Sequence, residues 1–343
     1  MRIGSTTVQT PRLATHVRTA GDATDPPLVL IHGNVSSGAF FADLMEALAR
    51  RDVYVIAPDL RGYGESERKT IDATRGMRDF SDDLHSLIET LGLITPLDLL
   101  GWSVGSGVVM QYAIDHPRKV KGLILEAAMS PYGFGGTRGV EGEAIWPDYA
   151  GSGGGTANPD FVKLLLEGER GLENPVSPRN TMRAFYVKQG FQFDPEKEEE
   201  LVTSMLATAV GDDVYPGDLT TSDNWPGVAP GRTGMNNAIS PRYLDLSPFA
   251  DLTPPTPVLW IRGDSDQIVS DTSLFDFGYL GSIGLVPGWP GEGVYPAQPM
   301  VSQLRAVLER AGNFREVIFE NCGHSPHLEH PQRFLEEVLS FLD

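Results

Sequence analysis

The pentapeptide Gly101-Trp102-Ser103-Val104-Gly105 has the G-x-S-x-G pattern of a nucleophile elbow. Residues 97–100 before it form an apolar run typical of a buried strand, and residues 108–112 after it fit a helix. In a strand–turn–helix of this kind the serine has a strained backbone, and the glycines let neighbouring chains approach closely. The pattern predicts that Ser103 is a nucleophile. A glycine-rich helix entrance with a capping serine is the alternative, and it explains none of the partners described next.

Two further loops carry an acid and a histidine, so that the chain order is serine, acid, histidine. Residues 263–269 follow the apolar run at 257–261, and residues 322–327 follow the apolar run at 316–319. Both runs read as strands. Catalytic side chains gather in the loops at the carboxyl ends of strands in open α/β sheets. The sequence therefore predicts that these two loops reach Ser103.

With these residues in place, the chain resembles the α/β-hydrolase superfamily over essentially its whole length. Residues 263–269 are similar to the superfamily's G-x-x-D-x-x-V pattern, which implies that Asp266 is the triad acid. Residues 323–326 are similar to its G-H-x-P loop, which implies that His324 is the general base. The resemblance thus implies a catalytic triad of Ser103, Asp266 and His324.

An upstream loop adds a fourth element of the resemblance. The predicted strand at 28–32 runs into His32-Gly33-Asn34, which resembles the superfamily's oxyanion-hole loop. The resemblance implies that the backbone N–H groups of Asn34 and Val104 face the oxygen that becomes negative in a tetrahedral intermediate. Donors fixed in advance of that charge are worth about 2.7–4 kcal/mol of barrier each.

The implied fold is α/β: an α/β-hydrolase fold with a mostly parallel eight-stranded sheet, flanking helices and an inserted, largely helical lid. We expect residues 1–129 and 251–343 to form the core and 130–250 to form the lid. Between Asp266 and His324, residues 270–300 exceed what one helix and one strand need, so an extra insertion is expected there. The periodicity predicts a hairpin at 5–20 and strands at 28–32, 53–57, 97–100, 119–126, 257–261 and 316–319. Core helices are predicted at 38–50, 78–92, 298–311 and 331–343. Lid helices are predicted at 159–170, 178–192 and 195–210.

The identity of the triad acid is open at the level of sequence. Glu126 ends the predicted strand at 119–126, and some superfamily members, such as haloalkane dehalogenases and a fungal zearalenone lactonase, carry the triad acid at the end of that strand. Either carboxylate can hold the imidazole N–H and stabilise the cation formed in catalysis. Asp266 is favoured because it lies in the usual sequence pattern, and Glu126 is kept as the alternative triad acid.

Aromatic residues near the elbow and in the two insertions are the candidates for substrate contacts. The expected substrate-binding residues are Trp102, Tyr186, Trp225 and Trp289. They suggest a bulky, largely apolar acyl or alcohol group, although each of them is equally explained by packing of the lid on the core. The irregular stretch 212–241 also holds the pair Asn236-Asn237, to which the sequence assigns no role. The 270–300 insertion either narrows the pocket or covers an oligomer interface.

Composition restricts the partners. The 343 residues carry a net charge of −19, which disfavours nucleic acid and anionic membrane surfaces. The single cysteine cannot form an internal disulfide, the N-terminus lacks an apolar leader, and no apolar run approaches the ~18 residues of a membrane span. We expect a cytoplasmic protein that acts on a small molecule, with homo-oligomerisation left open.

No cofactor or metal is expected. His16, His85 and His116 show no ligand spacing, and His327 and His330 are interpreted as surface residues. Cys322, next to the predicted catalytic histidine, is interpreted as a packing residue.

The predicted activity is a serine hydrolase that cleaves a carboxylic ester or lactone through an acyl-enzyme intermediate. Ser103 argues against haloalkane dehalogenases and epoxide hydrolases, which use an aspartate nucleophile. Three alternatives keep the serine: a cofactor-free perhydrolase (haloperoxidase), a C–C bond hydrolase, and a ligand receptor on a hydrolase scaffold. Perhydrolases usually have Gly-Gly where this chain has Gly105-Ser106, and a C–C hydrolase needs basic groups for which Arg183 and Lys188 are the candidates.

Overall fold

A single eight-stranded sheet organises the computed structural model, which describes residues 3–343. The strand order is β1-β2-β4-β3-β5-β6-β13-β14. Only β2 runs antiparallel to its neighbours, and all other pairs in this sheet are parallel, so the predicted mostly parallel sheet is confirmed. The strands are β1 (Gly4–Gln9), β2 (Ala14–Ala20), β3 (Pro27–Ile31), β4 (Tyr54–Pro58), β5 (Leu97–Trp102), β6 (Val120–Glu126), β13 (Val258–Gly263) and β14 (Phe314–Phe319).

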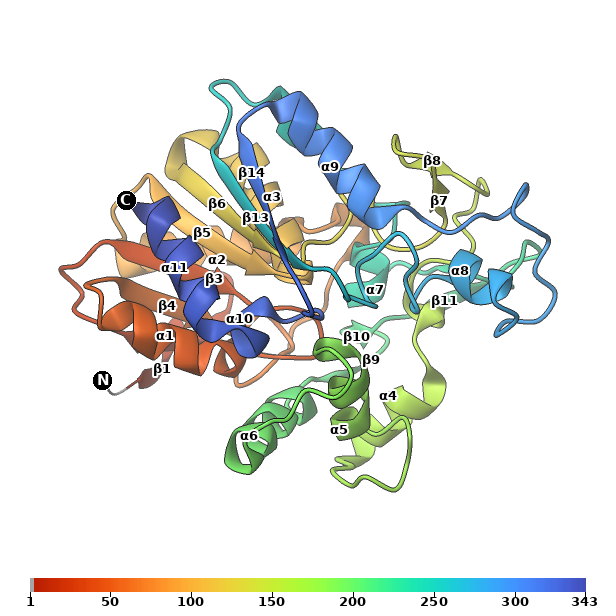
Figure 1. The fold of residues 1–343 in the computed structure, drawn as a ribbon, viewed down its shortest axis with the longest axis horizontal. Coiled ribbons are helices and arrows are strands. Elements are labelled where there is room, and N and C mark those ends of the chain that lie inside the picture. Colours follow the sequence, from red (N-terminus) through yellow and green to blue (C-terminus); the bar gives the residue numbers. More distant parts are fainter. Residues whose placement is uncertain (1–2) are drawn as a thin grey trace.

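Helices cover both faces of the sheet (Figure 1), which explains why its central strands are apolar runs with no polar alternation. Every residue of β5 is buried. Helix α1 (Ala42–Ala49) packs against α11 (Pro331–Leu342), and α2 (Arg78–Leu91) packs against α3 (Val104–Asp115). The remaining core helices are α9 (Met300–Ala311) and the short α10 (Pro326–Glu329), with 3₁₀ turns at Gly38–Phe41, Ala73–Arg75, Pro117–Lys119 and Ser247–Asp251.

Between the adjacent strands β6 and β13 the chain leaves the sheet for residues 127–257. Helices α4, α5 and α6 lie together outside the sheet (Figure 1, green). The glycine-rich part around residues 133–155 is mostly irregular. The elements of this segment are β7 (Thr137–Arg138), β8 (Glu143–Ala144), a 3₁₀ turn at Gly154–Thr156, α4 (Pro159–Glu167), α5 (Pro178–Thr181), a π-helix at Met182–Tyr186, α6 (Pro195–Leu206), β9 (Val210–Gly211), β10 (Tyr215–Pro216), β11 (Leu219–Thr221), β12 (Val228–Pro230) and α7 (Met235–Ala238).

The helix predicted at 178–192 is wrong in its second half. One α-helical turn passes into a π-helix, and the helical structure ends at Tyr186 because Val187 is extended. The next amide, that of Lys188, donates to the Glu329 side chain at 2.8 Å instead of to a helical carbonyl. A tertiary hydrogen bond, invisible to sequence periodicity, therefore ends this helix, and a π-helical turn of this kind is often found at functional sites.

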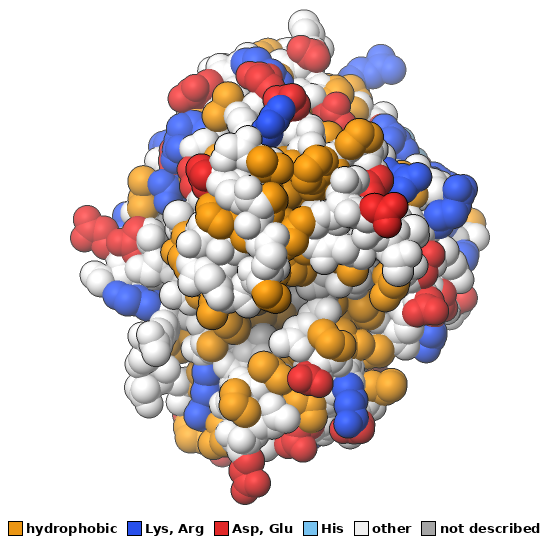
Figure 2. All heavy atoms as spheres, turned by 90° about the vertical axis from the view of Figure 1, so that its right-hand side faces the viewer, with side chains coloured by type: hydrophobic (Ala, Val, Ile, Leu, Met, Phe, Trp, Pro, Cys, Tyr) orange, Lys and Arg blue, Asp and Glu red, His pale blue; other side chains and the backbone are white. Residues whose placement is uncertain are grey.

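Residues 270–300 form an irregular excursion with one short helix, α8 (Phe277–Ser282). It packs against the segment between β6 and β13 through aromatic rings: Trp225 lies 4.8 Å from Tyr295 and 6.1 Å from Phe277, centroid to centroid. Phe185 and Phe275 meet edge to face at 5.0 Å. Seen from the side that carries α8, hydrophobic side chains surround a hollow in the surface (Figure 2).

Asp276 holds the 270–300 excursion together through backbone hydrogen bonds, but its carboxylate is buried. Its Oδ2 atom accepts from the backbone N–H groups of Tyr279 and Gln298, whereas Oδ1 is buried without a hydrogen-bond partner in the described chain. Burial raises the pKa of Asp276 to about 6, against the opposing effect of these backbone bonds. Since the folded-state pKa is raised, the favourable contribution of the protonated acid is complete below about pH 4 and is lost as pH rises through 6.

We therefore expect Asp276→Asn to stabilise the protein above pH 6, by up to about 3 kcal/mol, because the amide keeps both backbone bonds without a buried charge. Near pH 4 the difference between variant and wild type should disappear. Thermal or urea unfolding followed at pH 4, 6 and 8 measures it. An equal stability difference at all three pH values would contradict the assigned titration.

Candidate active site

The turn after β5 holds Ser103 at φ 55° and ψ −121°, a left-handed conformation that residues with a side chain seldom adopt. Its backbone N–H donates to the carbonyl of Glu126 at 2.9 Å. A Cβ on Gly101 would lie 2.4 Å from the Gly105 oxygen, and one on Gly105 would lie 2.1 Å from the Ile31 oxygen. Both elbow glycines are therefore required because neighbouring backbone atoms approach closely, as the sequence pattern predicts.

Ser106 fastens the same turn from within α3. Its hydroxyl donates to the Ser103 carbonyl and accepts from the Met129 amide at 3.1 Å. A glycine at this position would make neither bond. Ser106, which replaces the second glycine of the Gly-Gly found in perhydrolases, thus stabilises the turn.

His324 and Asp266 form a buried pair at the ends of β14 and β13. The Nδ1 atom of His324 lies 2.8 Å from Asp266 Oδ2, and both side chains are about 3% exposed. The other carboxylate oxygen, Oδ1, accepts from the amides of Ile268 and Val269 at 2.8 and 3.0 Å. Two backbone amides and one imidazole N–H therefore fix the orientation of the carboxylate, and this leaves His324 Nε2 as the ring's basic nitrogen.

Ser103 and His324 line one cavity of about 660 Å³. The structure has no hydrogen bond between the Ser103 hydroxyl and the His324 ring among residues 3–343. Catalytic hydrogen bonds are often long before substrate binds and tighten in the complex. The indole N–H of Trp102, next to Ser103, donates to the His324 carbonyl at 2.8 Å and ties the histidine loop to the elbow.

Asn34 and Val104, the two residues expected to form the oxyanion hole, line the same cavity. Within the described chain neither N–H has a hydrogen-bond acceptor, so both remain available to a ligand. The loop that carries Asn34 is held by Tyr186, whose hydroxyl donates to the carbonyls of Asn34 and Val35 at 2.9 and 3.3 Å. Burial raises the pKa of Tyr186, so it remains a protonated donor.

His32 fixes the other side of this loop. Its Nε2 accepts from the Leu60 amide at 2.9 Å, and its Nδ1 lies 2.8 Å from the Gly33 carbonyl. Burial lowers the pKa of His32 to about 4, so the ring is neutral at pH 7 and serves both contacts with one proton. The histidine of the His-Gly-Asn sequence therefore shapes the loop and does not carry charge to the cavity.

Glu126 does not contact His324. Its Oε1 atom lies 2.7 Å from Nδ1 of His327 and also accepts the His327 backbone N–H at 2.9 Å. The interpretation of His327 as a surface residue is wrong: the ring is 1% exposed and packs against Trp102, Phe41 and Phe334. The start of α10 places it in the core, which spacing alone does not indicate.

Glu329 holds the histidine loop from the opposite side. It accepts the Gly323 amide at 2.9 Å and the Lys188 amide at 2.8 Å, and thereby links this loop to the end of the π-helix. Burial raises the pKa of Glu329, against the effect of these amides. The neighbouring Cys322 is fully buried, and burial raises the pKa of its thiol, so it is a packing residue and not a second nucleophile.

The cavity wall is mostly apolar. Two of the predicted substrate-binding residues, Trp102 and Tyr186, are part of it. Trp225 and Trp289 are not: their indole N–H groups donate to the carbonyls of Pro287 and Tyr295, so they fasten the 270–300 excursion. The wall includes the apolar or aromatic residues Val35, Met129, Phe134, Phe161, Val176, Phe185, Tyr215, Ile239, Ile268, Val269, Leu274, Phe275, Phe277 and Leu280.

No lysine or arginine lines this cavity in the described part of the chain, and Asp160, at its exposed edge, is its one carboxylate. Arg183 pairs with Glu198, and Lys188 bonds to Asn321. The two basic residues considered for a carboxylate-bearing substrate are therefore engaged elsewhere.

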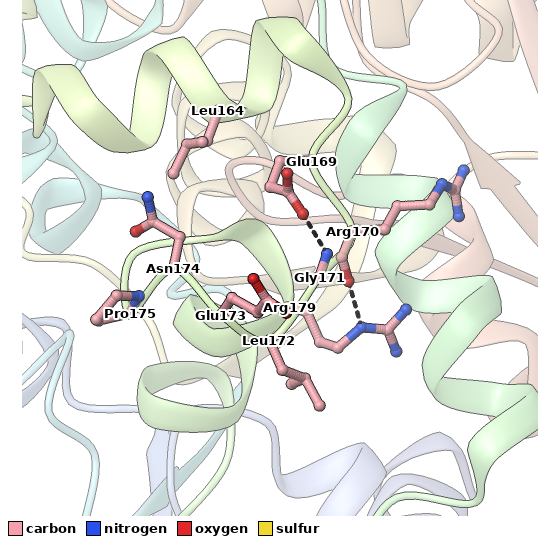
Figure 3. Close-up of a pocket in the computed structure, with 9 residues that line it drawn as sticks. All are labelled: Leu164, Glu169, Arg170, Gly171, Leu172, Glu173, Asn174, Pro175 and Arg179. Atoms are coloured by element: carbon pink, nitrogen blue, oxygen red, sulfur yellow. Dashed lines mark hydrogen bonds between the residues drawn. The ribbon is translucent and has the colours of Figure 1, made fainter.

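A second hollow, of about 750 Å³, lies between α4 and α5 on the outer side of the molecule (Figure 3). It is open and contains none of the predicted catalytic residues. Its two arginines, Arg170 and Arg179, both pair with Glu199, and Arg179 also donates to the Arg170 carbonyl at 2.7 Å. Both arginines are already engaged in ion pairs within the protein, so the chemistry points to the cavity at Ser103 and not to this hollow.

Sequence reasoning missed three residues of the site. His327 and Glu329 act through contacts that only the fold creates, so no local pattern reveals them. Asn236 lines the cavity from α7. The one available signal was an Asn-Asn pair in a segment predicted to lie over the serine.

Comparison with known proteins identifies the family of the chain. Residues 28–337 match the model of the alpha/beta hydrolase family. Over 330 residues the chain is 34% identical to the pimeloyl-[acyl-carrier protein] methyl ester esterase of Shewanella oneidensis, covering 95% of this chain and 94% of that protein. It is 35% identical over 141 residues to the 2-hydroxymuconate semialdehyde hydrolase of a Pseudomonas strain, covering 40% of this chain and 44% of the relative.

Several other curated relatives are likewise matched over less than half of their length. Among solved structures, the esterase EaEST of Exiguobacterium antarcticum superposes with a TM-score of 0.62 at 18% identity, over 98% of this chain and 99% of that one. At that identity the likeness concerns the fold. Within residues 3–343, no helix has the length and hydropathy needed to cross a bilayer.

Proposed function

Because the chain belongs to the alpha/beta hydrolase family, we propose that it is a serine hydrolase that cleaves a carboxylic ester or lactone. The observation that carries the proposal is the buried Asp266–His324 pair, whose histidine lines the same cavity as the strained Ser103. The esterase related to it over nearly its full length supports the same reaction class.

The proposed reaction begins when Ser103 Oγ attacks the carbonyl carbon and His324 Nε2 takes its proton. Asp266 holds the imidazolium that results. The amides of Asn34 and Val104 donate to the oxyanion, and His324 then protonates the leaving alkoxide. A water deprotonated by the same histidine attacks the acyl-enzyme and releases the acid.

The cavity supports an uncharged substrate with a sizeable apolar part. A volume of about 660 Å³ bordered mostly by aromatic and aliphatic side chains favours apolar groups. The absence of lysine and arginine from its described wall gives a carboxylate-bearing substrate no counter-ion. Esters and lactones fit this wall better than the acidic substrates of C–C bond hydrolases.

We expect the wild-type protein to hydrolyse p-nitrophenyl esters of graded chain length, or members of a lactone panel, with Ser103→Ala lowering kcat by at least about 10³-fold. The chain-length optimum would indicate how much of the cavity the acyl group fills. Equal inactivity of wild type and variant on every ester and lactone would contradict the proposal and direct attention to C–C substrates or to a receptor role.

The two buried carboxylates give a matched pair of variants. Asp266→Asn should lower kcat by about 10³- to 10⁴-fold, because His324 loses the group that fixes its tautomer and stabilises its cation. Glu126→Gln retains an oxygen for the His327 amide and should cost less than about 10-fold. Steady-state kinetics with circular dichroism as a folding control measures both. A loss in Glu126→Gln as large as that in Asp266→Asn would contradict the assignment of Asp266 alone as the triad acid.

A further inference from the structure

Asn236 carries hydrogen-bond donors that no described residue uses. It lies on α7 in the segment between β6 and β13, is only partly buried, and borders the cavity that contains Ser103. Its Oδ1 atom accepts from Asn34 Nδ2 at 3.2 Å. Within residues 3–343 its own Nδ2 has no acceptor, although the surrounding cavity wall is largely apolar.

The hydrogen bonds of neighbouring residues determine which atom of the Asn236 side-chain amide, oxygen or nitrogen, faces Asn34. The Val35 backbone N–H, which can only donate, lies 3.1 Å from Asn34 Oδ1, and the Tyr63 hydroxyl donates to the same oxygen at 2.7 Å. Asn34 must therefore present Nδ2 to Asn236. Because Asn34 donates, the facing atom of Asn236 must be its carbonyl oxygen. The Asn236 amino group is thus the end of a one-way chain from Tyr63 through Asn34.

The backbone under Asn236 is firmly held by its neighbour Asn237. The Asn237 carbonyl oxygen accepts from the amides of Gly154 and Gly231 at 2.8 and 3.0 Å. Its amino group donates to Asp218 and to the Thr233 carbonyl. The side-chain amide of Asn237 makes all its hydrogen bonds within the fold. It thereby fixes the backbone from which Asn236 faces the cavity.

Asn236 also lies next to a residue of the proposed oxyanion hole. Its partner Asn34 supplies a backbone amide to the proposed oxyanion hole, so the Asn236 side chain lies one hydrogen bond away from that residue. Because Asn236, Asn34 and Ser103 line one cavity, we expect a substrate group that meets Asn236 to lie within a few bonds of the scissile carbonyl. Once substrate displaces water, amide protons left without an acceptor weaken the binding of that substrate.

We propose that Asn236 is a specificity residue that selects esters carrying a second oxygen acceptor, such as an ether, hydroxyl or keto oxygen, close to the scissile carbonyl. This inference rests on the proposed ester or lactone hydrolysis. It narrows the substrate from any apolar ester to an oxygenated one. The donor on Asn236 binds the second oxygen while the amides of Asn34 and Val104 bind the first.

The test uses pairs of esters that differ by one CH₂-to-oxygen replacement. p-Nitrophenyl butanoate is paired with p-nitrophenyl methoxyacetate, and the pentanoate with the 3-methoxypropanoate; butyl and 2-methoxyethyl esters of one acid test the alcohol side. For each pair, the ratio of the two kcat/KM values is measured on one enzyme sample. Differences in folded fraction cancel in this ratio, and the intrinsic reactivity of the esters cancels when variant and wild type are compared.

We expect Asn236→Ala and Asn236→Leu, which keeps the branching of the side chain, to lower the ratio of oxygenated to plain ester about 3- to 10-fold for at least one pair. The exposed Asn313→Ala, remote from the cavity wall, serves as the matched asparagine control and should keep the wild-type ratio.

Unchanged ratios for all pairs in both Asn236 variants would overturn the inference. Equal losses on the plain and oxygenated members would overturn it as well, because they would assign Asn236 to the oxyanion or to the fold. Inactivity of the wild type on every ester would instead be a failure of the proposed function, and the inference would fall with it.

Discussion

The site depends on one strained backbone position. Ser103 occupies a left-handed conformation that costs about 1–3 kcal/mol and persists only where surrounding structure over-determines it. Here that structure is explicit: the Glu126 carbonyl holds the serine amide, Ser106 holds its carbonyl, and Gly105 lets the turn touch the Ile31 oxygen. These contacts come from β6, α3 and β3, so Ser103 is fixed by the centre of the sheet and not by a flexible loop.

Two buried acid–histidine pairs orient the residues around Ser103. Asp266 orients His324 at the cavity, while Glu126 orients His327 behind it. Glu126 therefore links the elbow, through its backbone carbonyl, to the histidine loop, through its carboxylate. Trp102 adds a third link by donating to the His324 carbonyl. The mutual position of serine and histidine is set by several hydrogen bonds between neighbouring strand ends, which is the kind of preorganisation that catalysis of acyl transfer requires.

The sheet was predictable from sequence because its strands are apolar runs next to turn residues, and the elbow glycines were predictable because their backbone needs leave no alternative residue. The helix at 178–192 was not, because a tertiary bond from Lys188 to Glu329 ends it early. The interpretation of His327 as a surface residue failed for the same reason: spacing cannot show that α10 turns the ring toward Trp102. Trp225 and Trp289 illustrate the general difficulty with insertions, in which large aromatic residues serve packing as readily as binding.

The central claim is that Ser103 becomes acylated, and pre-steady-state kinetics with mass spectrometry tests it most directly. A p-nitrophenyl ester that the protein turns over slowly is mixed with it, and the reaction is quenched in acid within the first turnover. The account predicts a p-nitrophenol burst that approaches one equivalent per chain and an acyl adduct on the peptide that contains Ser103, both absent in Ser103→Ala. Turnover with an adduct on another residue, or a burst retained in Ser103→Ala, would contradict the account.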